Sequence, residues 1–472
     1  MTDDGPVRSP SRMNALEAMM WRAEVDPRLR SPVTIVDVLD LEPDWERVVE
    51  AHEQATRFVP RLRDRVLEPW WGWGLPEWSP DPGFTLSDHL ERRRLGGTGG
   101  RRDLLDLAAA WASAPFERDR PPWAAMLVTG LEDGRAGYLL KIHHSLADGL
   151  GLVQILRLLH GSERDPARAR PLRAVPDRDG PSRLGLTGRR AVGLLDAAPG
   201  AVLAGLGWAA GAAERVVSDP LGRTRDGVTF LASAARAAVP HRVPPSPLLR
   251  GRSLDRRFLT WDVDLEELKH AGRAAGGSLN DAYLAAVLGG VARYHARFGV
   301  VPENVSVGMP MNTRGSDDAL GGNHWAGLRF AAPLRETDPA ARIRLVRDVV
   351  ADLRRERVMD GLGLIAPLLA SLPPVLLARV QGGATRRNDL QASNIPGLSR
   401  PAFIAGAQIE RSYAFGPLPG GAVMVALMSN RDTCCIGATV DPAAVTEPDV
   451  FAACLDEAFA EVLALGRPGH RA

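Results

Sequence analysis

The sequence predicts an α/β (α+β) fold with two lobes joined by a crossover segment. Helical and strand patterns are mixed along the chain, but the composition shifts to Arg, Pro, Asp and Ala between residues 161 and 251. The chain has 472 residues, of which 45 % are apolar and 24 % charged, so it can bury a sizeable core. We expect an N-terminal lobe over residues 1–160, a crossover linker with apolar helices over 161–251, and a C-terminal lobe over 252–472.

Apolar runs bounded by turn residues define the first lobe. Residues 32–41 are expected to form a strand. Residues 124–129 and 137–142 are expected to form a hairpin that turns at Glu132-Asp133-Gly134. After the hairpin, apolar residues recur at helical spacing and predict a helix: Leu152, Ile155, Leu156 and Leu159.

The most informative motif lies between the hairpin and that helix. His143 and His144 are followed, after three residues, by Asp148 and Gly149, a pattern expected by chance on the order of once per thousand such chains. A neutral imidazole takes a proton from an alcohol or an amine near neutral pH. Because His144 falls on a loop, where it can face a channel, the motif predicts acid–base chemistry. The structural alternative is a buried histidine pair, with Asp148 capping the next helix.

The second lobe begins with a strand predicted over residues 257–263. Helices follow, and no internal repeat is found. The later strands are expected over residues 305–309, 327–331, 421–428 and 434–440.

Two uncharged stretches, 197–213 and 361–378, are interrupted by proline or glycine and are shorter than the roughly 20 apolar residues that a membrane span needs. They are expected to be hydrophobic helices that pack in the core, line an apolar tunnel or lie on a bilayer surface.

A tryptophan cluster is expected either to lie at a bilayer interface or to pack in the core. It comprises Trp70, Trp71, Trp73 and Trp78.

Charge and cysteine content exclude several classes of protein. The formal net charge of +1 gives no electrostatic case for nucleic-acid binding. Cys434, Cys435 and Cys454 have no metal-ligand spacing, and neighbours on a strand point to opposite faces. The first residues show no basic-then-apolar pattern. These features predict a cytoplasmic protein without a bound metal, and they leave the oligomeric state open.

Several short blocks occur in a fixed order along the chain: Pro115 to Trp123, His143 to Gly149, Asn280 to Ala285, Ser393 to Gly397, Gly416-Pro417 and Ala426 to Ser429. With these blocks the chain resembles the bacterial wax ester synthase/diacylglycerol acyltransferase family, from about Met13 to Phe451. The chain departs from the family pattern at Pro122, where a Leu is usual, at Leu398, where a Pro is common, and at Glu17, where an Asp is usual.

The resemblance implies two similar lobes, like those of chloramphenicol acetyltransferase and the peptide-synthetase condensation domains. It also implies transfer of a long acyl chain from acyl-CoA, as cosubstrate, to the hydroxyl of diacylglycerol or of a fatty alcohol. No other cofactor is expected. Contact with a membrane or lipid-droplet surface would be peripheral. The alternatives are a condensation-type acyltransferase with another acceptor and a lipid-binding relative that has lost turnover.

Within this reading, His144 is the general base of a ternary complex, since no serine or cysteine stands in a nucleophile-elbow context. His143 is expected to support its neighbour through a hydrogen bond. Related folds imply that Asp148 pairs with an arginine and shapes the loop, with Arg63 as the candidate partner. Gly149 allows a tight backbone turn.

The second lobe offers weaker candidates. Ser278 and Asp281 match a helix capping box, which explains Asp281 without chemistry, whereas Asn280 could donate a hydrogen bond near the channel. Ser393 and Asn394 could stabilise an oxyanion or form a plain loop. His324 is expected to be a loop residue.

Overall fold

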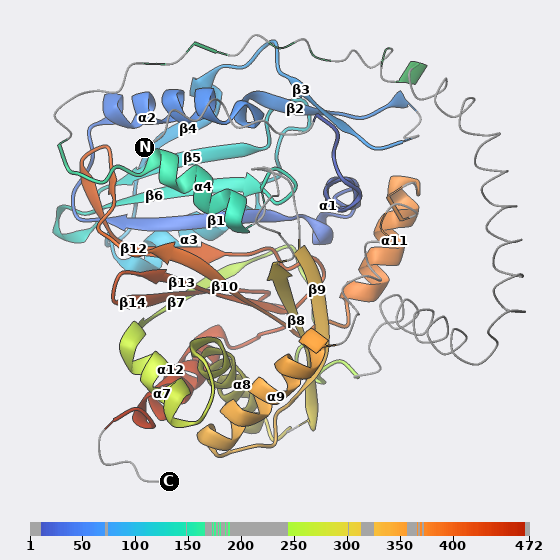
Figure 1. Cartoon of the computed structure of the whole chain (residues 1–472), viewed down its shortest axis with the longest axis vertical. Coiled ribbons are helices and arrows are strands. Elements are labelled where there is room, and N and C mark those ends of the chain that lie inside the picture. Colours follow the sequence, from blue (N-terminus) through green and yellow to red (C-terminus); the bar gives the residue numbers. More distant parts are fainter. Residues whose placement is uncertain are drawn as a thin grey trace, which may run out of the picture.

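Two six-stranded sheets form the centres of the two lobes (Figure 1). The computed structural model describes residues 11–70, 74–147, 149–165, 244–300, 302–312, 325–355 and 372–467. It also describes isolated positions at 172, 174, 175, 178, 180, 185, 187, 188, 366, 369 and 370. The stretch 197–213 lies outside these residues.

The first sheet has the strand order β11-β12-β1-β6-β5-β4. β1 pairs antiparallel with β6 on one side and β12 on the other, so it lies at the centre. The predicted strand over 32–41 and the predicted hairpin are confirmed. The strands are β1 (Pro32–Leu39), β4 (Leu90–Arg94), β5 (Trp123–Thr129), β6 (Ala136–His143), β11 (Phe403–Ile404) and β12 (Ala407–Phe415).

The second sheet has the order β7-β14-β13-β10-β8-β9 and contains the five strands expected for this lobe. β10 was missed at the sequence level, where its polar residues suggested a loop. A small separate sheet pairs β2 (Asp64–Leu67) with β3 (Glu77–Pro80). The strands of the second sheet are β7 (Arg257–Asp264), β8 (Asn304–Asn312), β9 (Trp325–Pro333), β10 (Leu390–Leu398), β13 (Val423–Asn430) and β14 (Thr433–Val440).

Strands from the C-terminal lobe cross over into the first sheet. β11 and β12 come from the C-terminal part of the sequence, yet they extend the first sheet, because β12 pairs with β1 from Thr34 opposite Phe415 to Leu39 opposite Ile409. The second lobe therefore contributes strands to the sheet that carries the histidine motif.

Helices cover the sheets in separate groups (Figure 1). α2 and α4 lie over the first sheet, while α7, α8, α9 and α12 cover the far face of the second. α3 packs between the lobes, against β1, β6 and β7. Side-chain caps at Asn14, Asp44, Asp264 and Ser278 satisfy amides at the starts of α1, α2, α7 and α8. The helices are α1 (Ala15–Ala23), α2 (Trp45–Phe58), α3 (Arg101–Ser113), α4 (Gly149–Leu159), α7 (Leu265–Ala274), α8 (Leu279–Arg297), α9 (Pro339–Arg355), α11 (Pro374–Thr385) and α12 (Pro448–Ala464).

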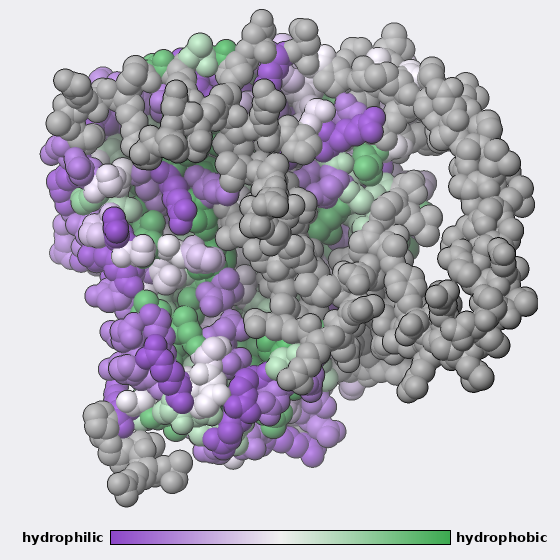
Figure 2. Space-filling view, viewed as in Figure 1, coloured by the Kyte–Doolittle hydropathy of each residue, from purple (hydrophilic) through white to green (hydrophobic). Residues whose placement is uncertain are grey.

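The seam between the lobes is an apolar core of its own. Phe258 of β7 and Phe415 of β12 stack with ring centroids 3.9 Å apart, and Cys435 is buried in the same cluster. Cys434 faces the core of the second lobe instead, so the two neighbouring cysteines point to opposite faces, as predicted. Outside this core, hydrophilic residues cover much of the visible outer surface of the second lobe (Figure 2).

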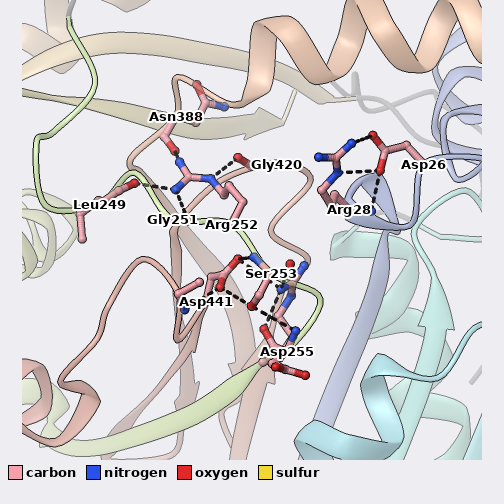
Figure 3. A network of polar contacts seen from close by, with 12 residues as sticks. Asp26, Arg28, Leu249, Gly251, Arg252, Ser253, Asp255, Asn388, Gly420 and Asp441 are labelled. Carbon is pink, nitrogen blue, oxygen red and sulfur yellow. Dashed lines mark hydrogen bonds and ion pairs between the residues drawn. The ribbon is translucent and has the colours of Figure 1, made fainter.

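Arg252 anchors the chain where it enters the second lobe (Figure 3). Its guanidinium donates to the carbonyls of Leu249, Gly420 and Asn388. Burial lowers the pKa of Arg252 against the opposing effect of nearby carboxylates. Beside it, Asp441 accepts from the amide and hydroxyl of Ser253, at 2.7 and 2.6 Å.

None of the helices in the described part of the chain is long and apolar enough to cross a membrane.

Candidate active site

The histidine motif sits on a clamped turn between β6 and α4. His143 is the last residue of β6, and its amide donates to the Pro122 carbonyl at 2.9 Å. The next amide, that of His144, donates to the carbonyl of Ser31 at 2.9 Å, and the Leu146 amide closes the turn onto the His143 carbonyl. His143 is fully buried, whereas His144 is half-buried. The turn therefore holds one histidine inside the protein and leaves the other accessible.

The ring of His143 is held at both nitrogens. Nε2 lies 2.9 Å from Oε1 of Glu24, and Nδ1 lies 2.6 Å from the Ser145 hydroxyl. The Ser145 amide also donates to Nδ1, at 3.1 Å. Because Nδ1 accepts that bond, the ring proton sits on Nε2 and is donated to the carboxylate.

Glu24 joins the end of α1 to this turn. Its Oε1 accepts both from His143 and from the amide of Ser31, whose carbonyl in turn accepts from His144. Burial raises the pKa of Glu24, but His143, the Ser31 amide and Arg118 outweigh it, so the net effect is a lowered pKa. Glu24 was missed at the sequence level, because its partner is 119 residues away along the chain.

Aromatic rings wall the buried histidine. Trp21 and Phe116 meet the His143 ring edge-on, with centroids 5.2 and 6.1 Å away. Arg118 covers Trp21 at 4.2 Å and donates to its carbonyl. Phe116 and Arg118 belong to the block 115–123, so this block frames the site.

Lys141 is the second residue that the sequence analysis missed. Its ammonium donates to the carbonyls of Trp111 and Ala114 at the end of α3, and it lies over the rings of Trp111 and Phe116. Burial, followed by the charge of Arg30, lowers the pKa of Lys141 to about 8. Only two of the 58 lysine and arginine residues are lysines. The rarity of lysine could therefore have drawn attention to Lys141 in the sequence.

The remaining members of the motif are described in part. Asp148 lies outside the described residues, and Gly149 begins α4. The guanidinium of Arg63 pairs with Glu53 at 2.7 Å and lies over the Phe84 ring. The pairing of Asp148 with Arg63 therefore stays a prediction.

In the second lobe, Asp281 has a structural role. Its carboxylate accepts from the amide and hydroxyl of Ser278, which completes the capping box of α8. Asn280 beside it is half-buried. One turn further on, the Tyr283 hydroxyl donates to the carbonyl of Val425 in β13, which ties α8 to the sheet.

Ser393 and Asn394 lie on β10, not on a loop, because this strand pairs in parallel with β13 and β8. Ser393 is half-buried and Asn394 exposed. Further along, Ile395 packs against the core of the first lobe, and β10 contacts α4. Gly397 fits a close approach: a Cβ there would lie 1.8 Å from the carbonyl oxygen of Ser429. The strand thus reaches from the second lobe towards the helix that follows His144.

The other candidate side chains have plain surroundings. Trp78 is buried and Trp70 exposed, while Trp71, Trp73 and His324 lie outside the described residues. Burial raises the pKa values of Cys434 and Cys435 to about 12, so neither is a ready nucleophile. Among the described residues, no cluster of His, Cys, Asp or Glu could hold a metal ion.

Solved structures with the same fold are acyltransferases and related condensing domains. The wax ester synthase/diacylglycerol acyltransferase of Marinobacter aquaeolei VT8 matches with a TM-score of 0.64 at 18 % identity, over 97 % of this chain and 100 % of that one. The first condensation domain of the CDA synthetase matches with a TM-score of 0.57 at 17 % identity, over 96 % and 97 %. The chain thus has the two-lobed fold of these proteins.

Sequence comparison narrows the class. The model of the wax ester synthase/diacylglycerol acyltransferase catalytic domain matches residues 11–283, and that of the family's C-terminal domain matches 321–462. A Mycobacterium tuberculosis protein named as a diacylglycerol O-acyltransferase is 39 % identical, over 98 % of this chain and 94 % of the relative. The chain belongs to the wax ester synthase/diacylglycerol acyltransferase family, and the resemblance inferred from its motifs is confirmed.

Proposed function

We propose that this acyltransferase moves a long acyl chain from acyl-CoA to the hydroxyl of diacylglycerol, of a long-chain alcohol, or of both, with His144 as the general base. The observation that carries the proposal is the clamped turn, which leaves His144 accessible beside a fully buried and fully bonded His143. Family membership supplies the substrate class.

The chemistry needs one imidazole and two bound substrates. His144 takes the acceptor's hydroxyl proton as the oxygen forms a bond to the thioester carbonyl carbon. The carbon–sulfur bond then breaks, and the leaving thiolate receives the proton from the imidazolium, so that free CoA and the ester are the products. Binding both substrates side by side supplies much of the rate. The high pKa values of the buried cysteines Cys434 and Cys435 disfavour an acyl-enzyme on either thiol.

Glu24 and His143 act as positioning residues in this proposal. Ser31 links them to the base, because its amide binds Glu24 and its carbonyl binds the His144 amide. The support that His143 gives to its neighbour therefore runs through the backbone of the turn, and Asp148 is proposed to pair with an arginine and shape the same loop. Asn280, Ser393 and Asn394 remain candidates for contacts to substrate or oxyanion.

The test offers labelled palmitoyl-CoA with diacylglycerol and hexadecanol in separate reactions, followed by thin-layer chromatography and measurement of CoA release. The proposal predicts labelled triacylglycerol, wax ester or both, with CoA released in equal amount. Bound lipid without CoA release would instead indicate a binding protein. CoA release that needs an amine or another acceptor would indicate a condensation-type enzyme.

We also propose that the protein contacts a membrane or lipid-droplet surface only peripherally.

A further inference from the structure

Two segments that the sequence analysis singled out meet at one edge of the molecule. One is the tryptophan stretch around Trp70, and the other is the apolar stretch that leads into α11. Arg22 of α1 joins them: its guanidinium binds the carboxylate of Glu68 and the carbonyls of Gly74 and Ala370, all at 2.7–2.8 Å. Figure 1 shows α1 and α11 at this edge.

α11 has one buried face and one exposed apolar face. Leu377 and Ala378 are buried, and Ala378 packs with Leu29 and with Ala23, the residue before Glu24. On the opposite face Val375, Leu376 and Val380 are 59 %, 45 % and 47 % exposed. Exposed apolar residues that stand singly are ordinary, but three within two turns of one helix form a patch.

The charged residues of α11 and of the turn that follows it are all basic. Arg379 lies between the apolar residues, Arg386 and Arg387 follow the helix, and all three are exposed. No acidic residue occurs from 361 to 388. The carboxylate of Asp26, which lies near Arg386, is hydrogen-bonded to Arg28 at 2.7 Å. An apolar stripe with arginines at its border complements a negatively charged lipid surface.

We propose that the exposed face of α11, defined by Val375, Leu376, Arg379 and Val380 and continued by Arg386 and Arg387, docks on an anionic phospholipid bilayer. Trp70, 47 % exposed in the adjoining loop, adds an amphipathic ring at the same edge. This inference rests on the proposed function, because it names the source of the lipid acceptor. Docking here would bring the bilayer close to α1, which ends beside Glu24 and the histidine turn.

The experiment is flotation of the full-length protein with vesicles of phosphatidylcholine, with and without phosphatidylglycerol. The variant R379Q/R386Q/R387Q should lose about 100-fold in affinity for phosphatidylglycerol vesicles, since each arginine near such a surface is worth roughly fivefold. Added salt should weaken the wild type in the same way. The variant V375S/L376S/V380S should lose at least about tenfold on both compositions, because it removes the inserted apolar area.

A matched control, L41S/L345S/V450S, removes three exposed apolar residues that lie apart, in the loop after β1, in α9 and in α12, and should float like the wild type. Failure of the wild type to float, or equal losses in the α11 variant and the control, would overturn the proposal. So would sedimentation that shows a dimer dissociated by V375S/L376S/V380S with vesicle binding unchanged, since the face would then cover a second copy.

The docking proposal and the proposed function can fail separately. His144→Ala should float like the wild type, because the imidazole has no part in docking. V375S/L376S/V380S should keep wild-type turnover of a short-chain acyl-CoA with a water-soluble alcohol, and lose rate when diacylglycerol is presented in phosphatidylglycerol vesicles. Loss of the soluble reaction to the same extent would contradict a docking role.

Discussion

Each lobe buries a histidine against a serine hydroxyl, and the two pairs have different surroundings. In the first lobe, Nδ1 of His143 lies 2.6 Å from Ser145. In the second, Nε2 of His295 lies 2.6 Å from Ser246. Both rings are fully buried.

The other ring nitrogen separates the two pairs. Nε2 of His143 donates to the carboxylate of Glu24, whereas Nδ1 of His295 bonds the carbonyl of Val291 in its own helix. The carboxylate near the second pair, Asp389, accepts from the amides of Ser246 and Ser306. The pair in the second lobe therefore ties chain segments together.

A buried His–Ser contact is therefore by itself a structural element. In our proposal the first pair differs because an accessible imidazole, His144, is its neighbour and shares its backbone turn. Variants of the two sites separate a pair that supports chemistry from a pair that supports only the fold.

The largest effect is expected from His144→Ala. Removal of the general base should lower kcat by about 10²–10⁴-fold with palmitoyl-CoA and diacylglycerol, because that is the usual worth of such a base. The melting temperature should stay unchanged, since the side chain is half-buried. A kcat near that of the wild type would exclude the assignment.

Glu24→Ala is expected to lower kcat by about 10–100-fold, because the His143 proton and the Ser31 amide lose their acceptor. Glu24→Gln keeps an acceptor oxygen and should recover most of the rate. A KM that rises while kcat holds would contradict a positioning role. Glu68→Gln, which weakens the Arg22 ion pair on the same helix, is the matched control. The ratio of its kcat at about pH 8 to its kcat at about pH 6, on either side of the ordinary histidine pKa, should equal that of the wild type.

Ser246→Ala tests the pair in the second lobe. It leaves His295 and the amides of Leu248 and Leu249 without the hydroxyl. The free energy of unfolding should fall by about 1–3 kcal/mol, with kcat unchanged in the folded protein. Loss of kcat at full stability would mean that the second pair also serves the reaction.

The two carboxylates should respond to pH with opposite signs. Burial raises the pKa of Asp389 to about 6, against the lowering effects of the Ser246 and Ser306 amides and of Arg252. The folded state then binds the proton more tightly than the unfolded state, whose carboxyl titrates near about 4, so this group's contribution to stability falls as the pH rises from about 4 to 6. Glu24, with its lowered pKa, contributes stability that is lost as the pH falls.

Asp389→Asn should remove the first of these effects. Denaturant unfolding at a series of pH values would measure it as a difference between variant and wild type that changes through that window. A constant difference across the window would contradict the raised pKa.

Local sequence patterns predicted the fold well, but they did not predict the residues that hold the histidine turn in place. Apolar runs sufficed for β1, the β5–β6 hairpin and most of the second sheet. β12 escaped because Glu410 and Arg411 interrupt its apolar pattern. β10 escaped because Ser393, Asn394 and Gly397 resemble a loop, although parallel neighbours make this segment a central strand.

The histidine motif pointed to His144 because its residues are close together in sequence. Glu24 forms a hydrogen bond with a residue 119 positions away along the chain, and Lys141 with one about 30 positions away. Only the folded chain reveals those partners. Their roles depend on tertiary geometry, which periodicity and spacing do not encode.

The role of His144 as the general base is tested by the pH dependence of kcat/KM. The wild type should show an ascending limb in the range where imidazoles titrate, because the base must be neutral to accept the acceptor's proton. His144→Ala should abolish that limb along with most of the rate. An identical ascending limb in His144→Ala would show that another group takes the proton, and would contradict the account.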